Sequence, residues 1–375
     1  MILIEKRKQM LNNKTVSVVI PSYNEEKQIA KVISTIPSFV DMIIIVNDKS
    51  QDNMSEVVKE KMPLDKYKRT KLFKRREDKL SDDPLHTATN IEIEMRLEDD
   101  EKFTPHKIID NGESKIILIE HLENGGVGAA IATGYKFARD HHIDCTAVMA
   151  GDGQMDPGEL ESICMPVIRE EVDYVKGNRL RHKSAKRFIP KIRYYGNSIL
   201  SILTKIASGY WRVSDTQTGY TSISLEALEN IELHKIYKRY GMPNDLLVKL
   251  NIASFKISEV IIKPIYHVGE ESKMKVSKVI PQVSWLLVKL FFERMFKKYL
   301  LKDFHPLFLL YFMSFLTFFI NIPITIRFFI EYFSSGEVMY GHLIVMSALG
   351  FISFQSFIFA MWFDMQDNDR LYQEN

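Results

Sequence analysis

The chain contains little cysteine and shows no secretory signal pattern in its first residues. Its two cysteines, Cys145 and Cys164, are too few for a disulfide framework, so we expect reduced and buried thiols. Residues 1–13 carry charge early and contain no long apolar run, which argues against a cleaved leader. We therefore expect the part of the chain before its first membrane segment to lie in the cytosol.

Two nucleotide-binding fingerprints are also missing. The GxGxxG pattern of dinucleotide sites does not follow the first expected strand, where the sequence is PSYNEE, and no P-loop pattern occurs anywhere in the chain. These absences argue against a membrane-anchored dehydrogenase. The net charge of +2 at pH 7 argues neither for nor against nucleic acid, and we expect no nucleic-acid partner.

Two long runs without Asp, Glu, Lys or Arg are present near the C-terminus. They cover residues 304–326 and 343–363, and each reaches the roughly 20 residues that cross the hydrocarbon core as a helix. A single run could be a buried helix of a soluble protein, but two in tandem favour a membrane hairpin, with Arg327 able to snorkel to the interface. Upstream, residues 272–303 hold eight Lys or Arg and two acids, which places this side in the cytoplasm.

These segments divide the chain into four parts. We expect a cytosolic α/β domain over residues 1–267, a basic juxtamembrane segment over 268–303, two membrane helices within 304–363, and a cytosolic tail over 364–375. Within the juxtamembrane segment, residues 283–300 predict an amphipathic helix that lies on the membrane surface. Two spans predict a multi-pass protein with both termini in the cytoplasm.

The α/β prediction rests on strand-like and helix-like segments that alternate over about the first 265 residues. Continuous apolar strands separated by helices predict a mostly parallel, Rossmann-like sheet with helices on both faces. The expected strands cover residues 16–21, 42–48, 115–121, 145–152 and 173–179. The expected helices cover residues 25–39, 50–62, 126–142 and 157–171. Ser50 or Asp52 is the expected cap of the second helix.

Three further segments have alternative interpretations. Residues 59–113 are basic in their first half and acidic in their second, which predicts a solvated surface excursion such as a charged helical hairpin, or else a flap that touches headgroups or a partner. Residues 186–208 mix basic, aromatic and apolar residues, so this helix either lies on the bilayer or packs against the α/β domain. Residues 266–276 are a candidate mobile lid.

Acids and glycines follow the expected strands, at the sheet edge where ligands bind in such folds. Asp48 stands where a carboxylate can bind a base or ribose hydroxyl, and the turn at residues 123–130 opens a helix whose free N–H groups can meet phosphate. Asp152 closes the fourth strand, and an acid that faces a diphosphate needs a divalent cation between them, Mg²⁺ or Mn²⁺. Asp156 is a second candidate ligand, although capping of the helix at Pro157 is favoured.

Seven short motifs occur along the chain: VVIPSYNEE, VNDKSQDN, HLENGGVGAA, MAGDGQMDP, VKGNRL, DTQTGY and YGMPNDLL. Their order resembles that seen in family 2 glycosyltransferases. Over Val16 to about His267 the chain resembles this family, and with its C-terminal hairpin it is similar to the polyprenyl-phosphate glycosyltransferases of the dolichol-phosphate mannose synthase type. The resemblance implies a GT-A fold, a UDP- or GDP-sugar donor, a polyprenyl-phosphate or other lipid-linked acceptor, and inversion at the anomeric carbon.

The resemblance also implies roles for individual residues. The donor nucleotide would lie against residues of the first two strand ends and the glycine turn: Pro21, Tyr23, Glu25, Asp48, Gly126 and Gly128. The catalytic residues would be Asp152, Gln154 and Asp245. Asp152 would hold the metal, Gln154 would lie near the sugar or acceptor, and Asp245 would lie beside the acceptor. The acceptor phosphate would be bound by Asn178, Arg179, Arg181 and Lys273. For Arg179 and Arg181 the alternative is a solvated strand end.

Two positions depart from the family pattern. Ala150 replaces the first acid of the usual Asp-X-Asp, which leaves metal ligation to Asp152 with water and Asp156. Val127 occupies a position in the glycine turn that often carries Lys, so one cation that could touch the diphosphate is absent. Both departures motivate an alternative of another class, a nucleotide-sugar-binding membrane scaffold without turnover.

The acceptor decides what catalysis requires. A lipid phosphate is largely anionic at neutral pH because its second pKa is about 6, so cations within residues 177–187 would suffice to hold it. A hydroxyl of a lipid-linked or surface glycan needs a general base, for which Asp245 is the candidate. Asp245 could otherwise orient metal and acceptor, or cap a helix. Packing of the hairpin makes a homo-oligomer plausible.

Overall fold

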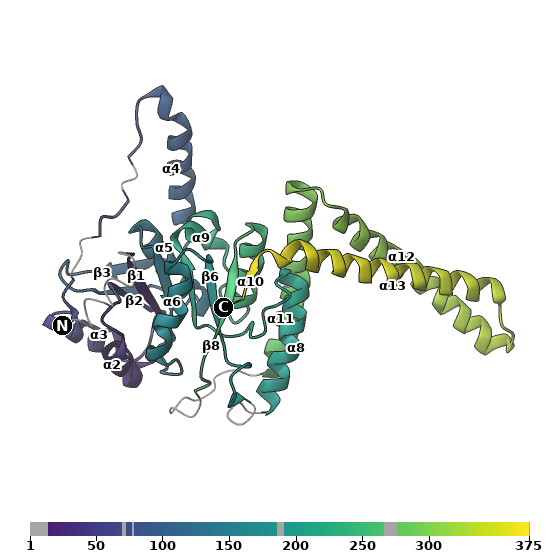
Figure 1. Ribbon diagram of the computed structural model, residues 1–375, viewed down its shortest axis with the longest axis horizontal. Coiled ribbons are helices and arrows are strands. Elements are labelled where there is room, and N and C mark those ends of the chain that lie inside the picture. Colours follow the sequence, from purple (N-terminus) through teal and green to yellow (C-terminus); the bar gives the residue numbers. More distant parts are fainter. Residues whose placement is uncertain (1–13, 70–72, 77–78, 186–190, 266–275, 375) are drawn as a thin grey trace.

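A nine-stranded sheet forms the centre of the molecule, which is described by a computed structural model over residues 14–69, 73–76, 79–185, 191–265 and 276–374 (Figure 1). The strands are β1 (Val16–Ser22), β2 (Met42–Asn47), β3 (His106–Ile109), β4 (Ile116–His121), β5 (Cys145–Val148), β6 (Tyr174–Asn178), β7 (Thr221–Ser224), β8 (Ile257–Ile261) and β9 (Tyr372–Gln373). Their order across the sheet is β3-β4-β2-β1-β5-β7-β6-β8-β9.

Four neighbouring strands, β4, β2, β1 and β5, are parallel, as the sequence predicts. Beyond them β7 runs antiparallel to both β5 and β6, so β6 has the same direction as β5. The parallel pairing continues through β8 to β9. The carboxyl ends of β1, β2, β4, β5 and β6 therefore share one edge of the sheet, which we call the site edge.

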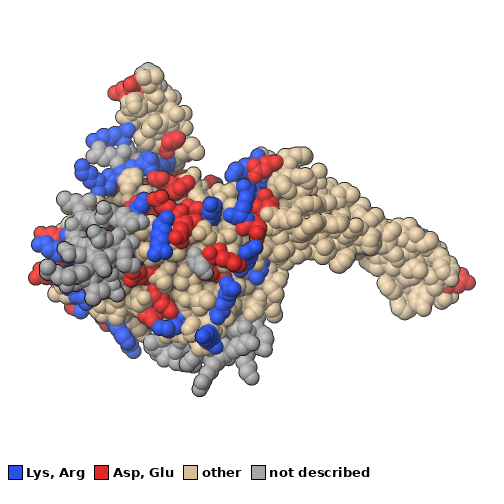
Figure 2. Space-filling model, in the orientation of Figure 1, with Lys and Arg blue, Asp and Glu red and all other residues tan. Residues whose placement is uncertain are grey.

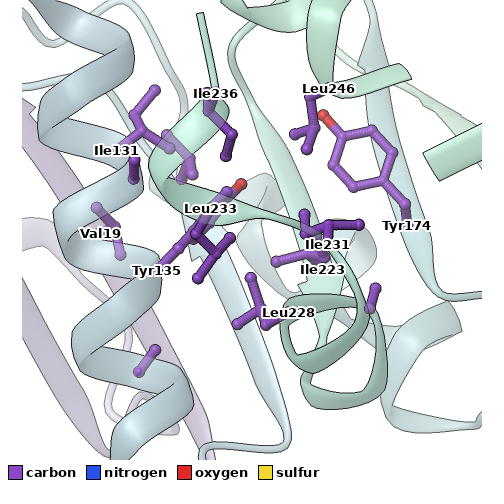
Figure 3. Close-up of a cluster of buried hydrophobic side chains, with 14 of the residues drawn as sticks. Val19, Ile131, Tyr135, Tyr174, Ile223, Leu228, Ile231, Leu233, Ile236 and Leu246 are labelled. Atoms are coloured by element: carbon purple, nitrogen blue, oxygen red, sulfur yellow. The ribbon is translucent and has the colours of Figure 1, made fainter. Parts of the chain in front are cut away.

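Helices cover both faces because successive apolar residues of a strand point to opposite sides. On one face Ile43 and Ile45 pack with α2 (Glu26–Thr35), α3 (Met54–Lys61) and α6 (Leu160–Ile168). On the other face Ile44 and Val46 pack with α5 (Val127–Asp140), α9 (Leu225–Asn230) and α10 (Met242–Ile252). Figure 3 shows part of this second core, with Tyr135 of α5 among the side chains of Leu228 and Leu233. The predicted two-sided sheet is confirmed.

One detail of the predicted elements differs. The fourth strand ends at Val148 rather than at Asp152, because the chain turns at Gly151 and Gly153 takes φ = 76°, which ends the extended run. Cys145 and Cys164 are buried and free, as expected.

The charged segment 59–113 is not a helical hairpin in its described part. One helix, α4 (Thr87–Asp100), rises from the body of the domain (Figure 1), and its only buried residue is Ile93. The chain then returns as β3, which pairs antiparallel with β4 along His106↔His121 to Ile109↔Leu118. An edge strand forms here because β4 would otherwise leave its backbone groups without partners.

The helix predicted over residues 283–300 is present within α11 (Val276–Arg294), which is continued by a π-helix, η5 (Met295–Lys302). Val283, Leu287 and Phe291 are buried on the side that faces α8 (Lys191–Ser208) and α10, while Trp285 and Phe292 are exposed on the opposite side. Figure 1 shows α8 and α11 side by side. The helix within residues 186–208 therefore packs against its neighbours; residues 186–190 lie outside the described residues.

Two helices of 30 residues each, α12 (Pro306–Ser335) and α13 (Tyr340–Asp369), form a hairpin that extends away from the sheet (Figure 1). Both are long and apolar enough to cross a membrane. They exceed the predicted runs because the turn is confined to residues 336–339, where Gly336 takes φ = 72°. In Figure 2 charged residues gather over the sheet domain, and the hairpin surface is nearly free of them up to its tip.

The segment after the second apolar run packs against the sheet domain. Asp364 and Asn368 of α13 are buried at the junction of hairpin and domain. The next residues form β9, which pairs with β8 along Ile257↔Tyr372 and Ser258↔Gln373. The predicted cytosolic tail therefore contributes the last strand of the sheet.

Candidate active site

Backbone contacts bring three motifs together at the site edge. The N–H of Asp48 donates to the carbonyl of Ser22 at 3.0 Å, which joins the ends of β2 and β1. The N–H of Met149 donates to the carbonyl of Val19 at 3.0 Å, which joins the end of β5 to β1. A Cβ on Gly151 would lie 2.5 Å from Ser22 Oγ, so this glycine lets the MAGDG bend approach β1. The bend with Asp152 thus lies next to the PSYNEE segment.

Asp48 is the centre of a buried hydrogen-bond cluster. Its Oδ1 accepts from His121 Nδ1 at 2.8 Å and from the N–H of Gly125 at 2.8 Å, and its Oδ2 accepts from the N–H of Gly126 at 2.8 Å. Burial alone would raise the pKa of Asp48, but the hydrogen bonds from His121 and the two glycines outweigh burial and lower it. The other ring nitrogen of His121 lies 2.9 Å from Thr133 Oγ1 on α5. The carboxylate therefore fixes the glycine turn.

The glycine turn does not offer the free N–H groups that the sequence predicts. The N–H groups of Gly125 and Gly126 are bound by Asp48, and that of Gly128 donates to the carbonyl of Lys238 at 2.9 Å. This prediction is wrong for these three groups, because a neighbouring carboxylate and a neighbouring loop satisfy them. A Cβ on Gly128 would lie 2.0 Å from the carbonyl oxygen of Tyr237, so the loop that contains Tyr237 and Lys238 closes over the turn.

Residues 23–26 are hydrogen-bonded to residues 50–52, which follow the strand end that carries Asp48. The N–H of Asn24 donates to Ser50 Oγ at 2.9 Å, and the N–H of Glu26 donates to Asp52 Oδ2 at 2.9 Å. Asp52 Oδ1 also accepts from the N–H of Met54 at 3.3 Å, although the residue at the N-cap of α3 is Asn53. The three predicted nucleotide residues here are Pro21 in β1, Tyr23 at the surface, and Glu25 at the N-cap of α2.

The two acids of MAGDGQMDP have different surroundings. Asp152 is half-buried, and its Oδ1 accepts from the N–H of Gln154 at 3.0 Å. Asp156 Oδ1 accepts from the N–H of Gly158 at 2.9 Å, and its Oδ2 lies 3.8 Å from Lys263 Nζ. Capping by Asp156 is thus confirmed.

Asp152 and Asp156 are the residues predicted to hold a divalent cation. Within the described residues no three His, Cys, Asp or Glu side chains converge as a metal cluster. This donor set still fits Mg²⁺, since that ion keeps several waters and is commonly held by one or two carboxylates together with substrate phosphates.

Asp245 lies in the first turn of α10 and is buried, with 3% of its surface exposed. Its Oδ2 accepts from the N–H of Tyr237 at 2.8 Å, and its Oδ1 pairs with Lys249. Burial raises the pKa of Asp245 despite this pairing. The N-cap of α10 is Gly241, so Asp245 does not cap the helix but holds the loop that covers the glycine turn.

The predicted phosphate-binding residues that the structure describes lie at or just after the end of β6, at the same edge. Asn178 is buried and donates from Nδ2 to Glu259 Oε2 at 2.9 Å. Arg179 donates from Nε and Nη2 to Asp215 at 2.8 and 3.1 Å. Arg179 is therefore anchored rather than solvated, whereas Arg181 is exposed. Lys273 and most of the predicted lid over 266–276 lie outside the described residues.

Three residues of this arrangement, His121, Asp215 and Glu259, were not predicted from the sequence. His121 and Asp215 belong to quoted motifs, HLEN and DTQTGY, so their positions were visible but their partners were not. Glu259 stands on β8, a strand that was not predicted individually, and no sequence pattern marks it.

Comparison with known proteins finds relatives of this chain. The model of the family described as "Glycosyl transferase family 2" matches residues 17–81 and 97–232. A UDP-N-acetylglucosamine–dolichyl-phosphate N-acetylglucosaminyltransferase of Methanococcus voltae is 29% identical over 68% of this chain and 87% of its own length. A dolichyl-phosphate beta-glucosyltransferase of Trichomonas vaginalis is 24% identical over 72% of each chain. A crystal structure of glucosyl-3-phosphoglycerate synthase from Mycobacterium tuberculosis has a TM-score of 0.47 and 15% identity, over 78% of this chain and 83% of that one.

Proposed function

The chain belongs to glycosyl transferase family 2, and from this premise we propose that it transfers a sugar from a UDP- or GDP-sugar to a polyprenyl phosphate at a membrane surface. The single observation that carries the proposal is the site edge. There the donor-side residues after β1, β2 and β5 and the phosphate-binding candidates after β6 emerge from strands that run in one direction. Ligands of parallel sheets bind at this edge.

The donor side would be built by the first two strand ends and the MAGDG bend. The nucleotide would lie against Tyr23 and Glu25, beside the turn that Asp48 fixes, with its diphosphate directed to Asp152. Asp152 would hold Mg²⁺ or Mn²⁺, and Asp156 would contribute at most through water because its Oδ1 caps η3 (Pro157–Glu159). A divalent ion supplies neutralisation of the charge that grows on the leaving diphosphate.

The hydrogen bonds of Arg179 and Asp245 favour a phosphate acceptor over a hydroxyl acceptor. Arg179 is held in one orientation by Asp215, which would present its guanidinium to a phosphate without further ordering. Asp245, the candidate base for a hydroxyl, already accepts from Tyr237 and pairs with Lys249. The Methanococcus voltae relative is named for a dolichyl-phosphate acceptor, which supports the same choice. Arg179 and Arg181 would then hold the acceptor phosphate. The buried Asn178 would fix the end of β6 through its bond to Glu259.

The membrane would be met by three apolar parts on one side of the domain. The exposed side chains Trp285 and Phe292 on α11 would lie at the lipid surface, and α12 and α13 would cross the bilayer. This arrangement brings a lipid-linked phosphate to the site from the cytoplasmic side. A general base is unnecessary, since the attacking phosphate oxygen is already anionic at neutral pH.

The test is transfer of a radiolabelled sugar. The full chain in mild detergent receives UDP- or GDP-sugars, Mg²⁺ or Mn²⁺, and undecaprenyl phosphate, and label is counted in the organic phase. We expect transfer by the wild type and by Asp65→Asn, an exposed control. Asp152→Asn should lose transfer and also bind Mn²⁺ more weakly in the presence of nucleoside diphosphate, measured by electron paramagnetic resonance.

Two outcomes would contradict the proposal. Label that moves to a glycan hydroxyl but never to lipid phosphate would support the Asp245-dependent alternative. Tight binding of nucleotide sugar with no transfer to any acceptor would support the scaffold alternative.

A further inference from the structure

The end of the second apolar helix is fixed to the sheet domain by a buried ion pair. Arg294 of α11 donates from Nη1 and Nη2 to the two carboxylate oxygens of Asp364 of α13, at 2.7 Å each, and both side chains are fully buried. Arg294 also donates to the carbonyls of Ala207 and Ile206 at the end of α8. A buried pair with this many bonds holds one arrangement, since loss of any partner leaves a charge without solvation.

The chain that follows this pair contacts the loop before β7. Arg212 Nε lies 2.8 Å from Asp369 Oδ1, and its Nη1 lies 3.3 Å from Glu374 Oε1. Between these two acids the chain forms β9, paired with β8. The segment 364–374 thus holds both β8 and the loop that contains Arg212.

The same loop and strand hold the predicted phosphate-binding residues. Glu259 on β8 accepts through Oε1 from the N–H groups of Ser214 and Asp215, at 2.9 and 3.0 Å, and through Oε2 from Asn178 Nδ2. Asp215 accepts from the N–H of Arg179 at 3.0 Å and from its guanidinium. Neither carboxylate is exposed enough to serve a ligand itself, with Asp215 fully buried and Glu259 7% exposed.

A buried lysine completes this cluster. Lys176 on β6 is fully buried and donates from Nζ to the carbonyl of Thr218 at 2.7 Å. Burial lowers the pKa of Lys176 to about 8, against the attraction of Asp215 and Glu259. Two cations and two carboxylates are thus packed beneath the end of β6, where Asp215 attracts both Lys176 and Arg179.

We propose that Asp215 and Glu259 are positioning residues of the acceptor-phosphate site, and that the segment 364–374 joins them to the second membrane helix. The inference rests on the proposed function for the identity of the ligand. The position of the second apolar helix and the orientation of Arg179 are then linked through the segment 364–374.

The first test measures binding of a short-chain polyprenyl phosphate to the nucleotide-loaded full chain by calorimetry, alongside transfer kinetics. Asp215→Asn should raise the acceptor Kd and KM about tenfold, since a charge-assisted pair is lost, while the Kd for nucleotide stays within about twofold. Asp215→Glu, which keeps the carboxylate, should recover part of the loss. Equal weakening of donor and acceptor binding, or unchanged acceptor binding, would overturn the positioning role.

The second test uses surface variants that leave the core intact. Arg212→Ala should raise the acceptor Kd only about threefold, because the contacts with Asp369 and Glu374 are exposed. Arg212→Lys keeps the positive charge and should restore the Kd. Arg370→Ala is the matched control, since Arg370 is exposed on the same segment and its guanidinium bonds to Asp367 of the same helix rather than to the loop before β7. No difference between Arg212→Ala and Arg370→Ala would remove the segment from the proposal.

The binding readout separates this inference from the proposed function. If lipid phosphate binds in a way that depends on Asp215 but no sugar is transferred, the proposed function is contradicted and the positioning role of Asp215 is supported. Wild-type protein that binds no lipid phosphate would overturn both.

Discussion

At the scale of single residues, a strand-end carboxylate can be used by the fold before any ligand arrives. Asp48 was predicted to meet a base or ribose, and three hydrogen bonds from the chain already converge on it. A carboxylate has roughly four lone-pair positions, so one direction remains for a ligand. Its direct role in nucleotide binding stays a prediction, while its role in shaping the glycine turn is visible.

Replacement of Asp48 by Asn should therefore destabilise the protein in a pH-dependent way. At pH 7 we expect a loss of about 2 kcal/mol in the free energy of unfolding, since charge-assisted bonds to buried N–H groups are weakened. The pKa of Asp48 is lowered in the folded state, so its stabilisation is complete above the unfolded value of 3.8 and is lost as pH falls through the folded value. Urea unfolding in detergent at pH 7, 5 and 3.5 checks this. A gap between wild type and variant that does not narrow at pH 3.5 would contradict it.

Gly128 provides a second prediction at this scale. A methyl group there would meet the carbonyl oxygen of Tyr237 at 2.0 Å, so Gly128→Ala must push the covering loop away. We expect a loss of about 1–3 kcal/mol in stability, as for overpacked sites, together with weaker nucleotide binding. Gly196→Ala is the control, because that helical glycine has no atom near the new methyl group. Thermal unfolding and nucleotide titration of both variants decide the point, and similar behaviour of the two would contradict it.

At the scale of elements, predictability followed burial. The four parallel strands were predicted because each is an apolar run covered on both faces, a pattern that a short window of sequence contains. β3 was not predicted, since His106 and Lys107 are polar and the strand exists only because β4 offers an edge. β9 has two residues, Tyr372 and Gln373, and depends wholly on β8, which lies more than a hundred residues earlier in the chain.

Some residues of the candidate site could be predicted from the sequence and others could not. Asp152, Asn178 and Arg179 could be located because each follows a recognisable strand within a motif. Their partners could not be located, since the contact of Arg179 with Asp215 spans 36 residues and that of Asn178 with Glu259 spans 81. Hydrogen bonds across such separations are set by packing and leave no local pattern.

The outward face of α11 allows a test of the membrane seat. Trp285 is 73% exposed on this face, which is unusual for a tryptophan unless lipid covers it. We expect strong quenching of Trp285 by lipids brominated near the headgroup, in a variant with Trp211 and Trp362 replaced by Phe and reconstituted into bilayers. Tryptophans favour this depth in membranes. A water-soluble quencher acting equally well before and after reconstitution would show that α11 does not lie on the membrane.

At the scale of the whole molecule, one buried ion pair links the hairpin to the sheet domain. Asp364→Asn leaves Arg294 buried without its charge partner, and we expect it to cost about 3–5 kcal/mol in the free energy of unfolding. The double variant Arg294→Met/Asp364→Leu should recover most of this loss because neither charge of the pair is left buried without its partner. Urea unfolding of the single and double variants measures both. A single variant as stable as wild type would show that the pair does not hold the hairpin.

The position of β9 has a consequence for how the protein is made. This strand is translated only after both long apolar helices, yet it belongs at the edge of the domain that precedes them. During synthesis the β8 residues that pair with β9 therefore stay uncovered until the hairpin has been made and the ribosome has released the following segment. If the hairpin spans a bilayer, as proposed above, we expect a nascent chain whose hairpin fails to insert to leave β9 unpaired, and the open edge of β8 would then expose that chain to chaperones and proteases.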